Sequence, residues 1–140
     1  MAFLKFFIGS LYALCVFLPN SLGQDYLPEE VKVFLKGLHD TCVKKVGVPD
    51  DINKNYDFSN KSPEAMCYMK CIMIEGGWAG EDEVPFYDKL IDGAHPQIKA
   101  YVEHMVNSCR NIPEGTQECE RTYNLFACAH QADPEHFYMP

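Results

Sequence analysis

The stretch CYMKC, residues 67–71, decides how this chain folds. Its two cysteines are four residues apart, and on a helix residues at this separation share a face with Cβ atoms about 5–6 Å apart. A disulfide needs a shorter Cβ–Cβ separation, about 3.5–4.5 Å. Cys67 and Cys71 therefore cannot bond to each other without strain, and we expect each to reach a different partner.

The N-terminal region predicts export. A short basic start, residues 1–5, precedes the apolar run FFIGSLYALCVFL, and Ser21 and Gly23 occupy positions −3 and −1 of a cleavage site before Gln24. This is the pattern of a secretory signal peptide, and the run is shorter than the ~20 residues that span a bilayer. We expect residues 1–23 to be the signal peptide and residues 24–140 to form one secreted, extracellular domain. An uncleaved membrane anchor is the alternative.

Six cysteines remain after cleavage, because Cys15 lies in the apolar run. They are Cys42, Cys67, Cys71, Cys109, Cys119 and Cys128. An even number in a small exported chain indicates a disulfide framework. Cys119 and Cys128 are nine residues apart, which puts them on opposite faces of a continuous helix. With that pair and the CYMKC pair excluded, ten of the 15 possible connectivities stay open.

Composition excludes several classes of function. The formal net charge is −8, and it becomes one unit more negative when Lys5 leaves with the signal peptide. An acidic domain without a cluster of basic residues argues against binding to nucleic acid or to anionic membranes. The sequence has no nucleophile elbow, phosphate loop or HExxH motif. We therefore expect no enzymatic activity, no cofactor and no metal.

Helical periodicity covers most of the mature chain, and the alternation typical of strands is absent. We expect helices at 28–46, 63–75, 84–91, 98–109 and 116–133, with a short polar helix at 49–56. Pro28, Ser62 and Thr116 are typical helix-start residues, and glycine or proline follows the ends. The sequence predicts an all-α domain of about six helices.

The cysteine spacing Cys42-x24-Cys67-x3-Cys71-x37-Cys109-x9-Cys119-x8-Cys128 resembles the six-cysteine signature of insect odorant-binding proteins. The resemblance implies the pairs Cys42–Cys71, Cys67–Cys119 and Cys109–Cys128, with the helices interlocked around an internal apolar cavity. It also implies a carrier that reversibly binds small hydrophobic molecules, odorants or pheromones, and moves them through aqueous fluid to receptors. The implied partners are a small apolar volatile ligand and a membrane odorant receptor, the implied state is a monomer or weak homodimer, and the location is sensillum lymph if the protein is olfactory.

Methionines at i, i+3 and i+7 of the helix that carries CYMKC indicate an adaptable apolar surface, because methionine is flexible and polarizable. The expected ligand-binding residues are Met66, Met69, Met73, Trp78, Phe86, Leu90, Tyr101, Met105, Phe126, Phe137 and Tyr138. Ordinary core packing is the alternative for each of them. The apolar C-terminal segment is expected to line or cover the pocket. His136, close to Asp133 and Glu135, is a candidate for a pH-dependent change there, and a solvated histidine is the alternative.

Two other kinds of site are disfavoured. Residues 39–42 (HDTC) resemble the catalytic helix of secreted phospholipases A2, but no glycine-rich calcium loop precedes them. A zinc site from Cys67, Cys71, His104 and Cys109 conflicts with paired thiols in an oxidising compartment.

Two alternatives to an olfactory carrier stay open: a carrier of hormone-like or dietary lipids, and a disulfide-stapled binding or inhibitor protein without a cavity. Asn60-Lys61-Ser62 is formally a glycosylation sequon. Pro63 directly after it, and the expected role of Ser62 as a helix cap, disfavour modification.

Overall fold

The computed structural model describes residues 26–54, 56–59 and 61–140, and within them the chain is helical. The five α-helices are α1 (Glu29–Val46), α2 (Pro63–Glu75), α3 (Tyr87–Asp92), α4 (Lys99–Ser108) and α5 (Glu120–Ala132). The described residues contain no strand, only an isolated bridge between Ala79 and Pro85. None of the helices described is both long and apolar enough to cross a membrane. The expected signal peptide and Asn60 lie outside the described residues.

The first two helices begin and end where their sequences predict. α1 follows Pro28 and ends at Gly47, which adopts the left-handed conformation (φ 78°) that glycine accepts without a steric penalty. The Ser62 hydroxyl accepts a hydrogen bond from the Ala65 N–H at 3.3 Å, and Pro63 occupies the first position of α2.

Other boundaries differ from the prediction. Residues 50–54 form turns with i→i+3 hydrogen bonds instead of a short polar helix. α3 begins at Tyr87, because the bridge that joins Ala79 to Pro85 holds the preceding residues in a loop. α5 begins at Glu120 and not near Thr116, because its N-cap residue Cys119 is left-handed (φ 68°) and interrupts the helix there.

The N-terminus of α5 is capped by a residue from a distant loop. Glu83 is buried, with 9% of its surface exposed, and has a φ of +61°. Its carboxylate accepts hydrogen bonds from the N–H of Cys119 (3.0 Å), the N–H of Thr122 (3.3 Å) and the hydroxyl of Thr122 (3.0 Å). A carboxylate at this position satisfies free N–H groups and interacts favourably with the helix dipole.

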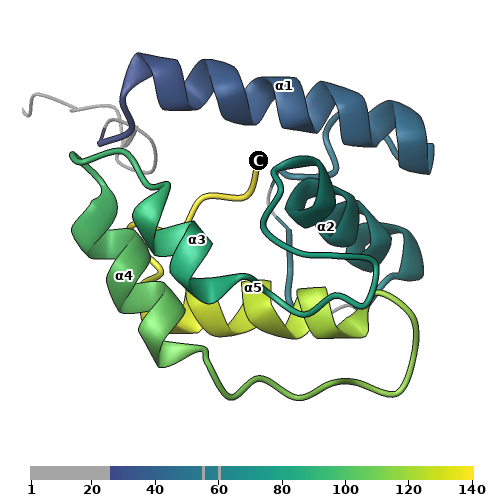
Figure 1. The fold of residues 1–140 in the computed structure, drawn as a ribbon. Coiled ribbons are helices and arrows are strands. Elements are labelled where there is room, and N and C mark those ends of the chain that lie inside the picture. Colours follow the sequence, from purple (N-terminus) through teal and green to yellow (C-terminus); the bar gives the residue numbers. More distant parts are fainter. Residues whose placement is uncertain (1–25, 55, 60) are drawn as a thin grey trace, which may run out of the picture.

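The helices surround the C-terminal segment, which runs into the middle of the molecule and ends beneath α1 (Figure 1). α1 packs against α2, α2 against α5, α5 against α4, and α4 against α3. α1 and α5 lie on opposite sides of the molecule (Figure 1). α2 packs against both of them, whereas the α3–α4 pair packs against α5 through α4.

Three disulfides fix this arrangement, and their pairing is the one that the family resemblance implies. Cys42 of α1 bonds to Cys71 of α2, and Cys67 of α2 bonds to Cys119 at the start of α5. The third disulfide joins Cys109, directly after α4, to Cys128 of α5. The two cysteines of CYMKC thus connect α2 to α1 on one side and to α5 on the other.

The solid part of the core lies around α2. Met66, Tyr68, Met69 and Ile72 are at most 1% exposed, and they pack with buried residues of α1 and α5. Complete burial of apolar side chains of this size stabilises the fold by about 1.5–3 kcal/mol each. The rest of the interior, towards α3 and α4, is not filled in this way.

Candidate ligand-binding site

A cavity of about 270 Å³ occupies the interior between the helices. All five helices, the chain before α1, the segment between α3 and α4, and the C-terminal segment contribute to its lining. The lining residues are Tyr26, Leu27, Val31, Phe34, Leu35, Ile72, Met73, Trp78, Leu90, Gly93, Ala94, His95, Ile98, Tyr101, Val102, Met105, Val106, Leu125, Phe126, Ala129, His136, Phe137, Tyr138 and Pro140. The set is almost entirely apolar or aromatic and contains no Lys, Arg, Asp or Glu, so the site is suited to hydrophobic ligands.

The apolar face of α4, which is evident from the sequence, lines the cavity. Ile98, Tyr101, Val102 and Met105 recur at 3–4-residue spacing, and all four line the cavity. Of the α4 residues only Val106 is buried, whereas the helices around the solid core bury more of their length. The apolar face of α4 therefore meets the cavity and not a packed interior.

The C-terminal segment completes the lining and is held by specific contacts. Phe137 packs edge-to-face against Phe126, with ring centroids 6.2 Å apart, and lies within 5.7 Å of the ring of Phe58. The Tyr68 hydroxyl, from the buried face of α2, donates a hydrogen bond to the backbone oxygen of Pro140. The structure thus holds the segment in place along the cavity wall.

Tyr26 and His136 form a polar group at the edge of the cavity. The Tyr26 hydroxyl donates to the backbone oxygen of His136, and burial, with the charge of Asp133 nearby, raises the pKa of Tyr26 to about 12. The Nδ1 atom of His136 lies 2.9 Å from Oδ2 of Asp133. The imidazole stacks on the ring of Tyr101, with centroids 3.7 Å apart and an interplanar angle of 9°.

The second histidine of the lining, His95, has both ring nitrogens engaged. Its Nε2 atom lies 2.7 Å from a carboxylate oxygen of Glu30, and its Nδ1 accepts from the Gln97 N–H at 3.1 Å. These partners assign the proton to Nε2, since a backbone N–H only donates and a carboxylate accepts.

Phe34 marks the side on which the cavity approaches the protein surface. It lines the cavity and yet is 51% exposed, and its ring meets the Trp78 ring edge-to-face at 6.0 Å. Trp78, the only tryptophan of the sequence, also lines the cavity.

Eight of the eleven residues expected to bind ligand line the cavity: Met73, Trp78, Leu90, Tyr101, Met105, Phe126, Phe137 and Tyr138. The other three lie elsewhere. Met66 and Met69 are buried in the solid core, and Phe86 is 46% exposed, with the ammonium group of Lys89 5.9 Å from its ring.

Sequence reasoning assigned no ligand contact to α1. Val31, Phe34 and Leu35 lie on its inner face and line the cavity. Their 3–4-residue spacing was visible in the sequence and indicated an apolar face, but the same pattern is typical of core packing.

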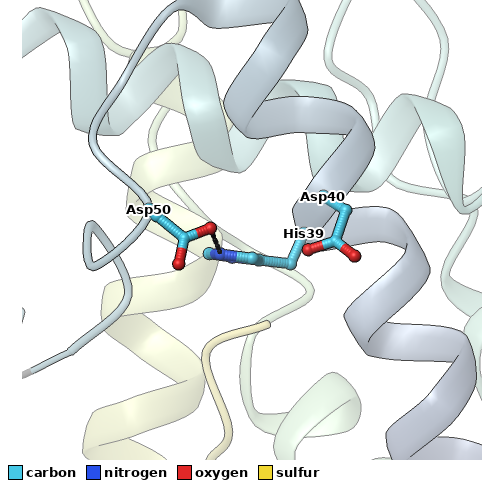
Figure 2. Close-up of side chains that lie close together, drawn as sticks. All are labelled: His39, Asp40 and Asp50. Carbon is cyan, nitrogen blue, oxygen red and sulfur yellow. Dashed lines mark ion pairs between the residues drawn. The ribbon is translucent and has the colours of Figure 1, made fainter.

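A group of three potential metal ligands lies outside the lining: His39, Asp40 and Asp50 have ligand atoms within 4.8 Å of one another. Figure 2 shows the two carboxylates on either side of the imidazole. His39 Nδ1 lies 2.6 Å from the Tyr68 hydroxyl, and Nε2 lies 3.5 Å from Asp50. Asp40 pairs with Lys36 at 2.7 Å, which lowers the pKa of the Asp40 carboxyl. These contacts account for the three side chains without a metal ion.

The disulfides also remove the zinc ligands considered from the sequence, since Cys67, Cys71 and Cys109 are each bonded to another cysteine. Cysteine binds zinc as a thiolate, which a disulfide-bonded cysteine does not offer.

Comparison with known proteins identifies relatives of this fold. The PBP/GOBP family matches residues 24–132. Odorant-binding protein 1 of Locusta migratoria is 30% identical, with a TM-score of 0.64 over 75% of this chain and 83% of its own. Odorant-binding protein 4 of the predator Chrysopa pallens is 18% identical, with a TM-score of 0.69 over 81% and 99%. A protein from the oral disk of the blowfly Phormia regina, described as the fatty acid binding protein OBP56a, is 27% identical, with a TM-score of 0.61 over 78% and 96%.

Proposed function

Because the chain belongs to the PBP/GOBP family, we propose that it is a secreted carrier that binds odorants or pheromones reversibly and transports them through aqueous fluid to receptors. Members of this family are binding and carrier proteins for small hydrophobic ligands. The finer assignments, to odorants, to an extracellular fluid such as sensillum lymph, to delivery to a membrane receptor and to a monomer or weak homodimer, are part of the proposal.

The observation that carries the proposal is the apolar cavity of about 270 Å³. An engineered apolar cavity of about 150 Å³ holds one benzene molecule, so by proportion this cavity accommodates about ten non-hydrogen atoms. That is the size of a small volatile alcohol, ester or terpene. An unfilled apolar cavity destabilises a fold in proportion to its volume, and an apolar guest recovers part of that loss.

The disulfides explain how the chain tolerates an interior that is not fully packed. Their loops, with sequence separations of 19, 29 and 52 residues, connect four of the five helices. Each such loop contributes about 3–4 kcal/mol in the chain-entropy model of disulfide stabilisation. This contribution offsets the packing free energy that the fold loses because the cavity is not filled by side chains. The same interior argues against a scaffold or inhibitor without a cavity.

The test is ligand binding by a variant whose cavity is filled. Val102→Trp places a large side chain in the lining, whereas Val33→Trp adds the same group at a position that is 70% exposed and outside the lining. Displacement of an apolar fluorescent probe by volatile alcohols, esters and terpenes measures binding. We expect the wild type and Val33→Trp to bind, and Val102→Trp to lose roughly 10-fold or more in affinity. Equal binding by the two variants would place the ligand elsewhere.

A carrier of dietary or hormone-like lipids is the second candidate, and the blowfly relative, described as a fatty acid binding protein, favours it. Tissue of expression separates an olfactory carrier from a dietary one, and the preference of the cavity for neutral or acidic ligands bears on the same question.

A further inference from the structure

We propose that the cavity selects uncharged ligands with a single hydrogen-bonding group, such as alcohols and esters, and excludes the carboxylates of the same chain length. This inference rests on the proposed carrier function and narrows it to a ligand class. Three features support it: the described side chains of the lining include no Lys, Arg, Asp or Glu, its two histidines are paired with acidic residues, and a small set of polar atoms is left for a neutral ligand.

Among the described residues, no cation of the lining is available to pair with a carboxylate. Lys and Arg are absent from it, and both ring nitrogens of His95 are engaged by Glu30 and by the Gln97 N–H. A carboxylate moved from water into an apolar site without a partner charge loses far more hydration free energy than an alcohol does.

His136 also favours a neutral ligand. The Asp133 carboxylate only accepts hydrogen bonds, so it fixes the His136 proton on Nδ1 and leaves Nε2 of the neutral ring as an acceptor. A hydroxyl group can donate to that atom and a carboxylate cannot. The imidazole is already paired with the Asp133 carboxylate at 2.9 Å, so it is not free to pair with a carboxylate of the ligand.

Two tyrosine hydroxyls supply the remaining polar atoms. Neither Tyr101 nor Tyr138 has a hydrogen-bond partner for its hydroxyl among the described residues, and the same is true of Nε2 of His136. No fully buried side-chain nitrogen or oxygen of the described chain lacks a partner, so these three atoms are reachable by water or by a ligand. A tyrosine hydroxyl both donates and accepts, and it therefore satisfies an alcohol, an ester or a ketone.

The test uses three ligands with the same eight-carbon chain: 1-octanol, methyl octanoate and octanoate. Each is titrated calorimetrically near neutral pH into the oxidised protein without its signal peptide. We expect the alcohol and the ester to bind, and octanoate to bind roughly 10- to 100-fold more weakly than 1-octanol, since it must enter without a partner charge. Octanoate binding as tightly as 1-octanol would overturn the inference and leave the carrier function intact. If none of the three binds, both the inference and the proposed function are overturned.

A second experiment tests the polar anchor. The double variant Tyr101→Phe/Tyr138→Phe removes two hydroxyls and keeps both rings, and Tyr87→Phe, on α3 and outside the lining, is the matched control. We expect the double variant to bind 1-octanol roughly 3- to 10-fold more weakly and to bind naphthalene, which forms no hydrogen bond, as the wild type does. Tyr87→Phe should change neither affinity. Undiminished binding of 1-octanol by the double variant would overturn the role of the two hydroxyls.

Discussion

Replacing Glu83 with alanine should destabilise the fold more than any other change of a carboxylate in its loop. The side chain is 9% exposed and accepts three hydrogen bonds from the first turn of α5, through Cys119 and Thr122. Loss of a helix cap costs about 0.5–2 kcal/mol, and hydrogen bonds to a charged group contribute about 1.5–3 kcal/mol. We therefore expect Glu83→Ala to lower the free energy of unfolding by about 2–3 kcal/mol, and the melting temperature by roughly 10 °C.

The assay is urea unfolding followed by far-ultraviolet circular dichroism, with all disulfides intact. Glu81→Ala is the matched control, because Glu81 lies in the same loop but its side chain is 85% exposed, with Lys70 3.7 Å away. Exposed pairs of this kind contribute about 0–1 kcal/mol. Glu83→Gln keeps an acceptor oxygen and loses the charge, so its free energy of unfolding should lie between those of the wild type and Glu83→Ala. The capping argument fails if Glu83→Ala unfolds at the same urea concentration as Glu81→Ala.

Three further outcomes follow from the structure. Tyr68→Phe removes the hydroxyl that contacts His39 Nδ1 and leaves that buried nitrogen without a partner, so the free energy of unfolding should fall by about 1–3 kcal/mol; an unchanged urea midpoint would contradict this. The pKa of Glu120 is lowered from 4.5 to about 2, chiefly by the hydrogen bond from Lys61 and next by that from the Thr116 N–H. The ionised Glu120 carboxylate therefore stabilises the fold fully above pH 4.5, and this contribution to the free energy of unfolding is lost as the pH falls towards 2. The difference in melting temperature between wild type and Lys61→Met should accordingly shrink over that range, and a constant difference would disprove the linkage. Each disulfide contributes about 3–4 kcal/mol in the chain-entropy model. Reduction of all three should therefore lower the melting temperature sharply and abolish ligand binding. A reduced protein that still binds ligand would show that the cavity does not depend on the disulfides.

Local signals in the sequence account for most of the helical framework. Ser62 and Pro63 mark the start of α2, and Gly47 marks the end of α1, because each of these residues supplies a conformation or a hydrogen bond that a helix end requires. The CYMKC spacing indicated that α2 is bonded in two directions. The choice among the remaining pairings came only from the family resemblance.

The methionine stripe shows why the binding residues were only partly predictable. Met66, Met69 and Met73 share one face of α2, as their spacing implies. Seven residues advance a helix by about 10 Å, however, so a single face extends from one environment into another. Met66 and Met69 lie in the solid core, and Met73 reaches the cavity. Periodicity identifies a face, and only the tertiary arrangement determines what that face meets.

The cap of α5 depends on tertiary structure in the same way. Thr116 is a good capping residue by type, but the helix begins later, and its N–H groups are satisfied by Glu83 from a loop more than thirty residues earlier in the chain. No local pattern marks such an interaction, since the donor and acceptor are brought together only when the loop packs against α5.

The disulfides are distributed unevenly around the cavity. α1, α2 and α5 each carry a cysteine in a bridge, and a bridge also follows α4 directly, whereas α3 and the residues after Cys128 contain none. α3 and the residues after Cys128 can therefore move apart from the other helices, to let a ligand enter or leave, while all three disulfides stay intact. The disulfides that link α1 to α2, and α2 to the start of α5, prevent those three helices from separating in the same way.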